Sequence, residues 1–476
     1  MIEIFNSKTK IIATLGPATS NREILRKMII AGLDVFRLNF SHGDYEEKVR
    51  IISLIRSIEE ELNVCVAILA DLQGPKIRLG MLPANGIKLE TGSEVVFSTS
   101  QDSSDSFFIN YDKFAVNTKL GDLILIDDGK IKLKVTETNK KDIVKAKVIV
   151  GGVAHSRKGV NLPDTIIELP SLTDKDLNDM QFIVNNDIDW VALSFVRSSE
   201  DIINLKKLIR NNNADLNIIA KIEKPEAVKN IDSIILETDG IMIARGDLGV
   251  EVDFCQVPTI QKNIITKCIS AAKPVIIATQ MLESMIQNFA PTRAEANDVA
   301  NAVLDGADTL MLSGETSVGA YPVESIEAME RIIEYTEANN TIYHRNQKPG
   351  VFSEDYLPDS VCYNASLMAE QTKAKAIVTF TYSGYTAFRL SSHRPKAEIY
   401  AFTGNDKLLR KLPLIWGVIK TFHIPNFDNI DKAINYSIEV LKSKKVLKTG
   451  DLVVHIGSTP ILARDRTNMI KLTIVD

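Results

Sequence analysis

Cysteine is scarce in this sequence, and the few cysteines lie far apart. The chain of 476 residues has four, which are Cys65, Cys255, Cys268 and Cys362. None belongs to a CxxC pair or to another spacing that is typical of a metal site. We therefore interpret them as reduced thiols of a cytoplasmic protein, which leaves no role for a disulfide framework.

Long apolar runs and a strong excess of one charge are also missing. No apolar run approaches the roughly 18 residues of a membrane-spanning helix, so we expect no membrane partner. The N-terminal stretch MIEIFNSKTKIIATLG has no apolar core before a small-residue cleavage site, so we expect no signal peptide. A net charge of -5 and a pI near 5.9 argue against a general nucleic-acid binder. Local sites for small anions stay possible.

Short apolar runs rich in β-branched residues recur through the chain. The eight runs are KIIATLG, DVFRLNF, CVAILADL, WVALSFV, NIIAKIE, GIMIARGD, PVIIATQ and TLMLSGE. Their near-continuous hydrophobicity is typical of strands that are buried on both faces. Segments with helical periodicity separate most of them, which indicates parallel βαβ units. Eight such units favour a (β/α)8 TIM barrel in the α/β class, and an open doubly wound sheet is the alternative.

Two of the helical segments carry clear signals. The segment 45–62 is expected to place one apolar face at Val49, Ile52, Ile55 and Ile58. The segment TRAEANDVANAVLDG ends on Gly306, which is suited to close a helix in the left-handed conformation.

One interval between the runs is too long for a helix and its loops. More than a hundred residues separate CVAILADL from WVALSFV, and stretches such as GIKLETGSEVVFS alternate apolar with polar residues. We predict an inserted all-β domain at about residues 75–168. The barrel would then comprise residues 1–74 and 169–342. After a stretch with Pro and Gly, a second α/β set predicts a C-terminal α/β domain at residues 343–476.

Polar side chains follow most of the apolar runs. They are Arg37, Asn39 and Ser41, then Asp71, Lys221 and Glu223, Arg245 and Asp247, Thr279 and Gln280, and Ser313 and Glu315. In a (β/α)8 barrel the C-terminal strand ends share one face, so these residues are expected to form one site. The alternative is that polar residues merely mark strand ends. That alternative poorly explains charges that alternate with core positions, as in IIAKIE.

The residue types at these ends indicate phosphate and metal chemistry. Glu223 and Asp247 are acidic oxygen donors on adjacent runs, and with ligand oxygens and water they suit Mg²⁺ or Mn²⁺. Lys221 lies two residues before Glu223, so both should point to one face of an extended segment. There an ammonium can stabilise charge on a phosphoryl group or an enolate, and a structural Lys–Glu ion pair is the alternative. Arg37 and Arg78 are natural phosphate clamps.

Together the residues resemble the pyruvate kinase family. The motifs that carry the resemblance are TKIIATLGPAT, DVFRLNFSHG, DLQGPKIR, KGVNLP, IIAKIEKPEAVKNIDSI, GIMIARGDLGVE, KPVIIATQMLESMI and PTRAEANDVANAVLDGADTLMLSGETSVGAYPVE. They stand in the family's order between about Thr9 and the closing TNMIKLTIVD. The resemblance implies that the insertion is a β-barrel lid and that the C-terminal domain is regulatory. It also implies a glycolytic enzyme that transfers a phosphoryl group from phosphoenolpyruvate to ADP, giving pyruvate and ATP.

The resemblance assigns roles on the substrate side of the site. Arg37 would hold the transferring phosphoryl group, and Lys221 would stabilise its transition state. Gly246 and the backbone of Asp247 would receive the substrate carboxylate. Thr279 would bind substrate and help to place the proton that converts enolpyruvate to pyruvate.

The resemblance also assigns a nucleotide side. Its residues would be Asn39, Phe40, Ser41, His42, Arg78 and Lys158, with Lys158 supplied by the lid. His42 could instead cap a turn. We expect Ser313 and Glu315 to organise the site by hydrogen bonding rather than to act in the chemistry.

The stretch ADLQGPKIR departs from the common pattern of the family. Members that need K⁺ usually have an acidic residue at the position of Lys76 and threonine at that of Leu72. The ion would lie among groups that match Asn39, Ser41, Asp71 and Leu72. Lys76 supplies a fixed ammonium near these groups, so we predict that K⁺ is not required. The alternative is that Lys76 points into solvent at the hinge of the lid.

The C-terminal domain contains a hydroxyl-rich loop, TFTYSGYT, after an apolar run. Phosphate could be cradled at a helix N-terminus by Thr381, Ser383, Gly384 and Thr386. Arg389 and Arg394 follow shortly after. By resemblance, this loop would bind an activating sugar phosphate or nucleotide in a homotetramer. A Ser/Thr-rich turn without a ligand is the alternative.

Two other functions stay open. One is a different barrel enzyme of phosphoenolpyruvate or pyruvate, such as a metal-dependent aldolase or lyase, which dependence on ADP would distinguish. The other is a binding protein of the same fold without catalysis.

Overall fold

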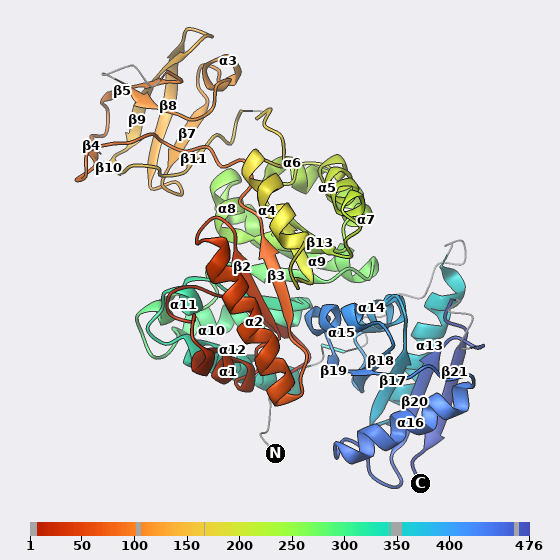
Figure 1. Cartoon of the computed structure of the whole chain (residues 1–476). Helices are drawn as coiled ribbons and strands as arrows, with labels where there is room; N and C mark the ends of the chain where they lie inside the picture. Colours follow the sequence, from red (N-terminus) through yellow and green to blue (C-terminus); the bar gives the residue numbers. More distant parts are fainter. Residues whose placement is uncertain (1–6, 101–105, 166, 341, 344–354, 461–465) are drawn as a thin grey trace.

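The centre of the molecule is a closed barrel of eight parallel strands (Figure 1). The computed structural model describes residues 7–100, 106–165, 167–340, 342–343, 355–460 and 466–476. The barrel strands are β1 (Lys10–Thr14), β2 (Val35–Asn39), β3 (Ala67–Asp71), β12 (Trp190–Leu193), β13 (Asn217–Ile222), β14 (Gly240–Ala244), β15 (Val275–Ala278) and β16 (Thr309–Leu312). Every apolar run of the sequence contributes one of them. The barrel is therefore confirmed, and the open sheet is excluded.

Helices surround the barrel and return the chain from strand to strand. They are α1 (Arg22–Ile30), α2 (Tyr45–Leu62), α4 (Asp174–Val184), α5 (Ser199–Asn211), α6 (Pro225–Lys229), α7 (Ile231–Glu237), α8 (Arg245–Glu251), η1 (Phe254–Gln256), α9 (Val257–Ser270), η2 (Glu283–Ile286), α10 (Arg293–Asp305), α11 (Gly314–Ser317) and α12 (Pro322–Asn339). Helix α10 ends at Gly306 (φ 101°), as expected. No helix among the described residues is both long and apolar enough to cross a membrane.

One detail of helix α2 differs from the expectation. The side chain of Val49 is 43% exposed, whereas Ile52, Ile55 and Ile58 are buried as expected. The buried face of the helix contains Lys48 and Ile51 in addition to these isoleucines. Val49 lies about 100° further around the helix than Lys48, which places it outside the buried face.

The insertion between β3 and α4 is built of strands, as predicted. These strands are β4 (Ile87–Leu89), β5 (Glu94–Ser98), β6 (Phe107–Phe108), β7 (Leu123–Ile126), β8 (Ile131–Thr138), β9 (Ile143–Val150), β10 (Gly152–Ala154) and β11 (Val160–Asn161). They form a six-stranded sheet, β11-β7-β8-β9-β5-β6, and a two-stranded sheet, β10-β4. A single short helix, α3 (Phe114–Asn117), interrupts them in the described part of the insertion. Figure 1 shows the insertion and the C-terminal domain at opposite ends of the molecule.

The C-terminal domain has a five-stranded sheet in the order β19-β18-β17-β20-β21. Its elements are α13 (Tyr356–Thr372), β17 (Ala376–Phe380), α14 (Tyr385–Ser392), β18 (Glu398–Thr403), α15 (Asp406–Lys411), η3 (Leu412–Leu414), β19 (Val418–His423), α16 (Ile430–Ser443), β20 (Leu452–Gly457) and β21 (Met469–Ile474). The antiparallel edge strand β21 was not foreseen, because its exposed side chains hide the apolar pattern. Residues 344–354 of the expected linker lie outside the described part of the chain. The domain limits themselves stay predictions.

A buried histidine makes the stability of the C-terminal sheet dependent on pH. His455 in β20 stacks on Phe380 with ring centroids 6.2 Å apart, and Lys471 lies opposite it in β21. Its Nδ1 lies 3.3 Å from Thr473 Oγ1, and Nε2 has no hydrogen-bond partner among the described residues. Burial, assisted by Lys471, lowers the pKa of His455 to about 4. The folded domain therefore holds the neutral ring where an unfolded chain would already bind a proton.

We predict that acidification from about pH 8 to about pH 5.5 lowers the free energy of unfolding by about 1 kcal/mol through His455 alone. The unfolded state gains a proton in this range and the folded state does not, so stability is present at high pH and falls as the pH falls. The variant His455→Phe should lack this part of the pH dependence. Urea denaturation of both proteins at the two pH values measures the free energy of unfolding. If this free energy changes equally with pH in the two proteins, the prediction is contradicted.

Candidate active site

A buried carboxylate joins three strand ends at the mouth of the barrel. Asp71 closes strand β3, and its Oδ2 accepts from Arg37 Nε at 2.7 Å and lies 2.6 Å from Arg37 Nη2. Its Oδ1 accepts from Lys221 Nζ at 3.1 Å. Burial alone would raise the pKa of Asp71, but Lys221 and Arg37 outweigh it and lower the pKa below its usual value. Asp71 therefore stays ionised and holds two cations together.

Lys221 is a fixed positive charge in this site. Besides Asp71, its ammonium lies 3.0 Å from Glu223 Oε1 and donates to Ser194 Oγ at 2.7 Å. Burial disfavours the ammonium, but the carboxylates of Asp71 and Glu223 raise the pKa of Lys221 above its usual value. The alternative role for Lys221 was a structural ion pair with Glu223, and this ion pair is present. Three acceptors around one ammonium suit a group that stabilises charge and not a base.

Two carboxylates face the same region from neighbouring elements. Glu223 is buried, and its Oε2 accepts from the backbone N–H of Phe195 at 2.8 Å. Asp247 lies in the first turn of helix α8 with a side chain that is 31% exposed. Burial raises the pKa of Glu223, and the negative charge of Asp247 adds to this rise against the effect of Lys221. A divalent cation between the two would relieve this repulsion.

Protein groups alone would not complete such a metal site. Within the described ranges, no group of three or more His, Cys, Asp or Glu side chains could hold a metal ion. Two carboxylates leave most positions of an octahedral Mg²⁺ to ligand oxygens and water, as is usual for this ion at phosphate sites. The donor set of Glu223 and Asp247 therefore fits a metal that binds together with its substrate.

Thr279 follows strand β15 in an unusual backbone conformation. Thr279 and Gln280 have φ angles of 71° and 56°, which side chains rarely adopt. The Thr279 hydroxyl accepts from the backbone N–H of Gly246 at 2.8 Å and donates to the carbonyl of Ala278 at 2.6 Å. A Cβ atom at Gly246 would lie 3.2 Å from Thr279 Oγ1, so glycine allows this close approach. The N–H that was expected to receive a substrate carboxylate is thus bound to Thr279 here.

The residues expected on the nucleotide side occupy two separate places. Asn39 and Ser41 lie together after β2, where Asn39 Oδ1 accepts from the Ser41 backbone at 3.0 Å. The Phe40 side chain is buried in the core, and His42 is exposed. Phe40 and His42 therefore belong to this loop without sharing one environment.

The two cations expected from the lid side are bound to groups of the insertion. Lys158 Nζ lies 2.7 Å from Asp127 Oδ1, and Arg78 Nη1 donates to the carbonyl of Arg157 at 3.1 Å. The Lys158 side chain is half-buried, and its ion pair is open to solvent on one side. Arg78 and Lys158 thus lie with the lid, apart from the loop after β2.

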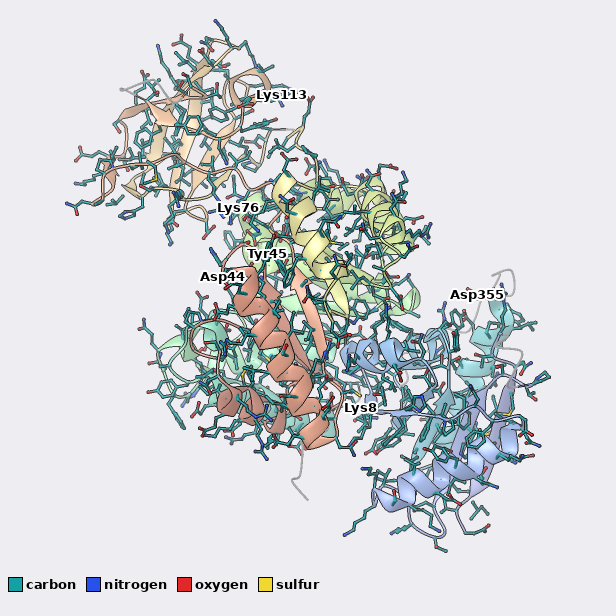
Figure 2. All side chains as sticks on the ribbon, viewed as in Figure 1. Lys8, Asp44, Tyr45, Lys76, Lys113 and Asp355 are labelled. Atoms are coloured by element: carbon teal, nitrogen blue, oxygen red, sulfur yellow. The ribbon has the colours of Figure 1, made fainter. Side chains whose placement is uncertain are left out.

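Lys76 lies where the inserted sheet joins the barrel, as Figure 2 shows. Its ammonium is 3.8 Å from Asp247 Oδ1, and its side chain is only 28% exposed. A Cβ atom at Gly159 would lie 2.9 Å from Lys76 Cε, which shows how closely the returning lid segment covers it. Lys76 therefore points toward a site carboxylate rather than into open solvent.

The other groups of the predicted monovalent-cation position have partners within the chain. Leu72 is buried, and its carbonyl accepts from Ser194 Oγ at 2.7 Å. Asp71 is bound to Arg37 and Lys221, as described above. Asn39 Oδ1 accepts from the Ser41 backbone, so three of the four groups are already bound to protein donors.

The hydroxyl-rich loop of the C-terminal domain borders a cavity of about 350 Å³. Thr381, Ser383 and Thr386 line it, and Gly384 (φ 91°) begins helix α14 beside it. The Gly384 N–H donates to Thr381 Oγ1 at 3.0 Å. Asp355 lines the same cavity, and Figure 2 shows it on the far side of the molecule from Lys76.

The two arginines that follow this loop in sequence do not line the cavity. Arg389 Nε lies 2.7 Å from Asp359 Oδ1. Arg394 is buried, and its Nη2 lies 3.0 Å from Asp308 Oδ1 at the base of the barrel. Arg466, which lies in the connection between β20 and β21, lines the cavity instead. The expectation that Arg389 and Arg394 supply this site is therefore wrong, because long-range ion pairs engage both.

Several residues of the site were not foreseen. Thr14 Oγ1 accepts from Arg37 Nη1 at 2.9 Å, and Ser194 binds Lys221. Like the predicted site residues, both lie at the C-terminal end of a barrel strand, since Thr14 ends β1 and Ser194 follows β12. The Glu315 carboxylate accepts from the backbones of Ser313 at 2.7 Å and Leu282 at 3.1 Å. This confirms that Glu315 organises the loops after β15 and β16.

Comparisons with known proteins agree along nearly the whole chain. The family profile "Pyruvate kinase, barrel domain" matches residues 6–326, and "Pyruvate kinase, alpha/beta domain" matches residues 359–473. The pyruvate kinase of Clostridium perfringens is 41% identical over 472 residues, which cover 98% of this chain and 99% of that protein. The pyruvate kinase of Agrobacterium vitis is 40% identical and covers 98% of each chain.

A solved structure supports the same relationship. The crystal structure of a pyruvate kinase from Cryptosporidium parvum matches with a TM-score of 0.92 and 35% sequence identity. The match covers 99% of this chain and 96% of that chain.

Proposed function

The chain belongs to the pyruvate kinase family, and we propose that the site at the barrel mouth transfers a phosphoryl group from phosphoenolpyruvate to ADP. The observation that carries the proposal is the convergence of Arg37 and Lys221 on Asp71, beside the carboxylates of Glu223 and Asp247. Phosphoryl transfer needs little covalent chemistry from a protein. It needs fixed charges in the right positions, which this cluster supplies.

On the substrate side, each residue has a separate task. Arg37 holds the transferring phosphoryl group, and the Lys221 ammonium stabilises its charge in the transition state. Glu223 and Asp247 would hold Mg²⁺ or Mn²⁺, which would supply neutralisation of the charge on the reacting substrate. Gly246 and the backbone of Asp247 receive the substrate carboxylate, and Thr279 also binds the substrate. The Thr279 hydroxyl helps to place the proton that turns enolpyruvate into pyruvate.

On the nucleotide side, the loop after β2 and the lid bind ADP together. The loop contributes Asn39, Phe40, Ser41 and His42. Arg78 and Lys158 reach the phosphates when the lid closes. Closure also excludes water, which protects the phosphoryl group from hydrolysis. A metal-dependent aldolase or lyase would need neither ADP nor these lid cations. A coupled assay for pyruvate and ATP, run with and without ADP, therefore tests the proposal, and turnover without ADP would overturn it.

Regulation and ion dependence complete the proposal. The enzyme works in the cytoplasm as a homotetramer, and a sugar phosphate or nucleotide bound at the C-terminal cavity raises its affinity for substrate. Lys76 replaces K⁺ as the monovalent charge near the phosphoryl group. Its approach to Asp247 supports this role, because a solvent-directed lysine would not face a site carboxylate.

We predict that Lys221→Met lowers turnover by at least about a hundredfold while the fold stays intact, since one oriented charge at the transition state is worth about 3–4 kcal/mol. The substrate affinity should change less. Lys224→Met is a matched control, because Lys224 is equally buried and also pairs with a glutamate, Glu251, at 2.6 Å. Steady-state kinetics of both variants measure the loss of turnover. A loss of less than about tenfold in Lys221→Met would rule out the role.

The K⁺ prediction concerns Lys76. The wild-type enzyme should reach nearly full activity with Mg²⁺ in a K⁺-free buffer based on tetramethylammonium or Tris. Lys76→Glu, alone or combined with Leu72→Thr, should make activity depend on added K⁺, because an acid then takes the place of the built-in ammonium. Activity is measured against K⁺ concentration. A wild-type enzyme that gains about a hundredfold from K⁺ would exclude the role of Lys76.

The effector prediction concerns the C-terminal cavity. Titration with fructose 1,6-bisphosphate, ribose 5-phosphate, glucose 6-phosphate and AMP should reveal at least one ligand that lowers the KM for phosphoenolpyruvate. Ser383→Asp should weaken that response, because a carboxylate in the cavity repels phosphate. Ser443→Asp, on the exposed end of α16, is the control. Flat responses to all four ligands, with Ser383→Asp also silent, would favour a loop without a ligand.

A further inference from the structure

The backbone turn that carries Thr279 is strained at two consecutive residues. Thr279 and Gln280 both have positive φ angles, 71° and 56°. Threonine is β-branched, and such residues adopt this region only when their surroundings impose it. Outliers of this kind gather at functional sites. The turn therefore needs a group that holds it.

The guanidinium of Arg245 is that group. Its Nη2 donates to the carbonyls of Thr279 at 2.8 Å and Gln280 at 3.1 Å. The same nitrogen lies 2.9 Å from Met281 Sδ. One planar group thus binds the carbonyls of both strained residues, which fixes the orientation of their peptide planes.

An acidic residue from another helix holds the guanidinium in place. Arg245 Nη1 donates to Asp298 Oδ1 at 2.9 Å, and Asp298 Oδ2 lies 2.8 Å from the same nitrogen. Asp298 belongs to helix α10, whereas Arg245 begins helix α8. Only 12% of the Arg245 side chain is exposed, whereas 37% of the Asp298 side chain is exposed, so the ion pair lies at the edge of the site. The turn is therefore fixed between two helices.

The residue after Arg245 binds the threonine hydroxyl itself. The Gly246 N–H donates to Thr279 Oγ1 at 2.8 Å. The segment Arg245–Gly246 thus holds Thr279 twice, through its carbonyl and through its hydroxyl. Loss of the first contact would leave the turn held through the hydroxyl alone.

We propose that Arg245, anchored by Asp298, is a positioning residue that keeps the Thr279 turn left-handed so that the threonine hydroxyl faces the enolate. The inference rests on the proposed function. In the step concerned, C3 of enolpyruvate takes a proton, and a C3–H bond forms as the enolate oxygen becomes a carbonyl. The Thr279 hydroxyl passes its proton to C3 and takes one from a water molecule, and the resulting hydroxide is neutralised by a proton from the buffer. Arg245 touches neither atom and acts through the backbone.

The first test separates this proton step from substrate binding. Arg245→Lys keeps the charge, but it puts a single nitrogen in place of the two guanidinium nitrogens that bind Asp298 and the carbonyls separately. We expect kcat to fall at least about tenfold with the KM for phosphoenolpyruvate changed less than about threefold. The exchange of pyruvate methyl protons in deuterated water, followed by NMR with Mg²⁺ and ATP, should fall by at least the same factor. Thr279→Ala serves as the reference for a lost hydroxyl.

The second test asks whether Arg245 acts by stabilising the strained backbone of Thr279 and Gln280. Glycine adopts positive φ without strain and alanine does not. Gln280→Gly should therefore restore part of the exchange in the Arg245→Lys background, by at least about threefold, whereas Gln280→Ala should restore none. If Arg245→Lys fails to fold, Asp298→Asn takes its place in both tests, because it removes the charge that anchors the guanidinium.

The outcomes distinguish this inference from the proposed function. A wild-type chain that forms no pyruvate from phosphoenolpyruvate and ADP overturns both. An active wild type whose Arg245→Lys variant keeps its exchange within about twofold, while Thr279→Ala loses it, overturns the positioning role alone. Equal rescue by Gln280→Gly and Gln280→Ala also overturns it. Selective rescue by glycine supports it.

Discussion

The barrel mouth depends on one buried negative charge, the carboxylate of Asp71. Arg37 and Lys221 come from strands β2 and β13, and both direct their charge toward it. Without Asp71, two buried cations would repel each other in a medium that screens them poorly. With it, the two side chains stay close to each other, and Lys221 keeps its charge. The barrel thus holds two cations in fixed positions at its open end, each paired with a carboxylate.

The same face also combines rigid support with local strain. Parallel strands end in register, as Asn39 opposite Asp71 shows, so short polar side chains meet there without long loops. The left-handed turn at Thr279 is unfavourable by itself, and it persists because Arg245 and Gly246 bind both its carbonyl and its hydroxyl. Stability elsewhere in the barrel supports a conformation that the local sequence would not choose.

The sequence predicted the barrel and most of its polar strand ends, because both follow from short-range patterns. Lys221 and Glu223 alternate with buried residues in β13, and this period of two is visible in the letters. The conformation of Thr279 could not be predicted, since threonine prefers extended backbone and carries no mark of a left-handed turn. The partners of Arg389 and Arg394 were also hidden. Asp359 and Asp308 are distant in sequence, and no local period reports an ion pair between separate elements.

The cations of the site divide into fixed and exchangeable ones. Arg37 and Lys221 both pair with the buried Asp71, and breaking such a pair is costly because it leaves an uncompensated charge. Lys158 pairs with Asp127 where 41% of its side chain is exposed, and an ion pair of this kind contributes about 0–1 kcal/mol. A phosphate can therefore replace Asp127 as the partner of Lys158 at little expense. The barrel cations are fixed by pairs with a buried carboxylate, whereas Lys158 is free to change partners, as its proposed role with a nucleotide requires.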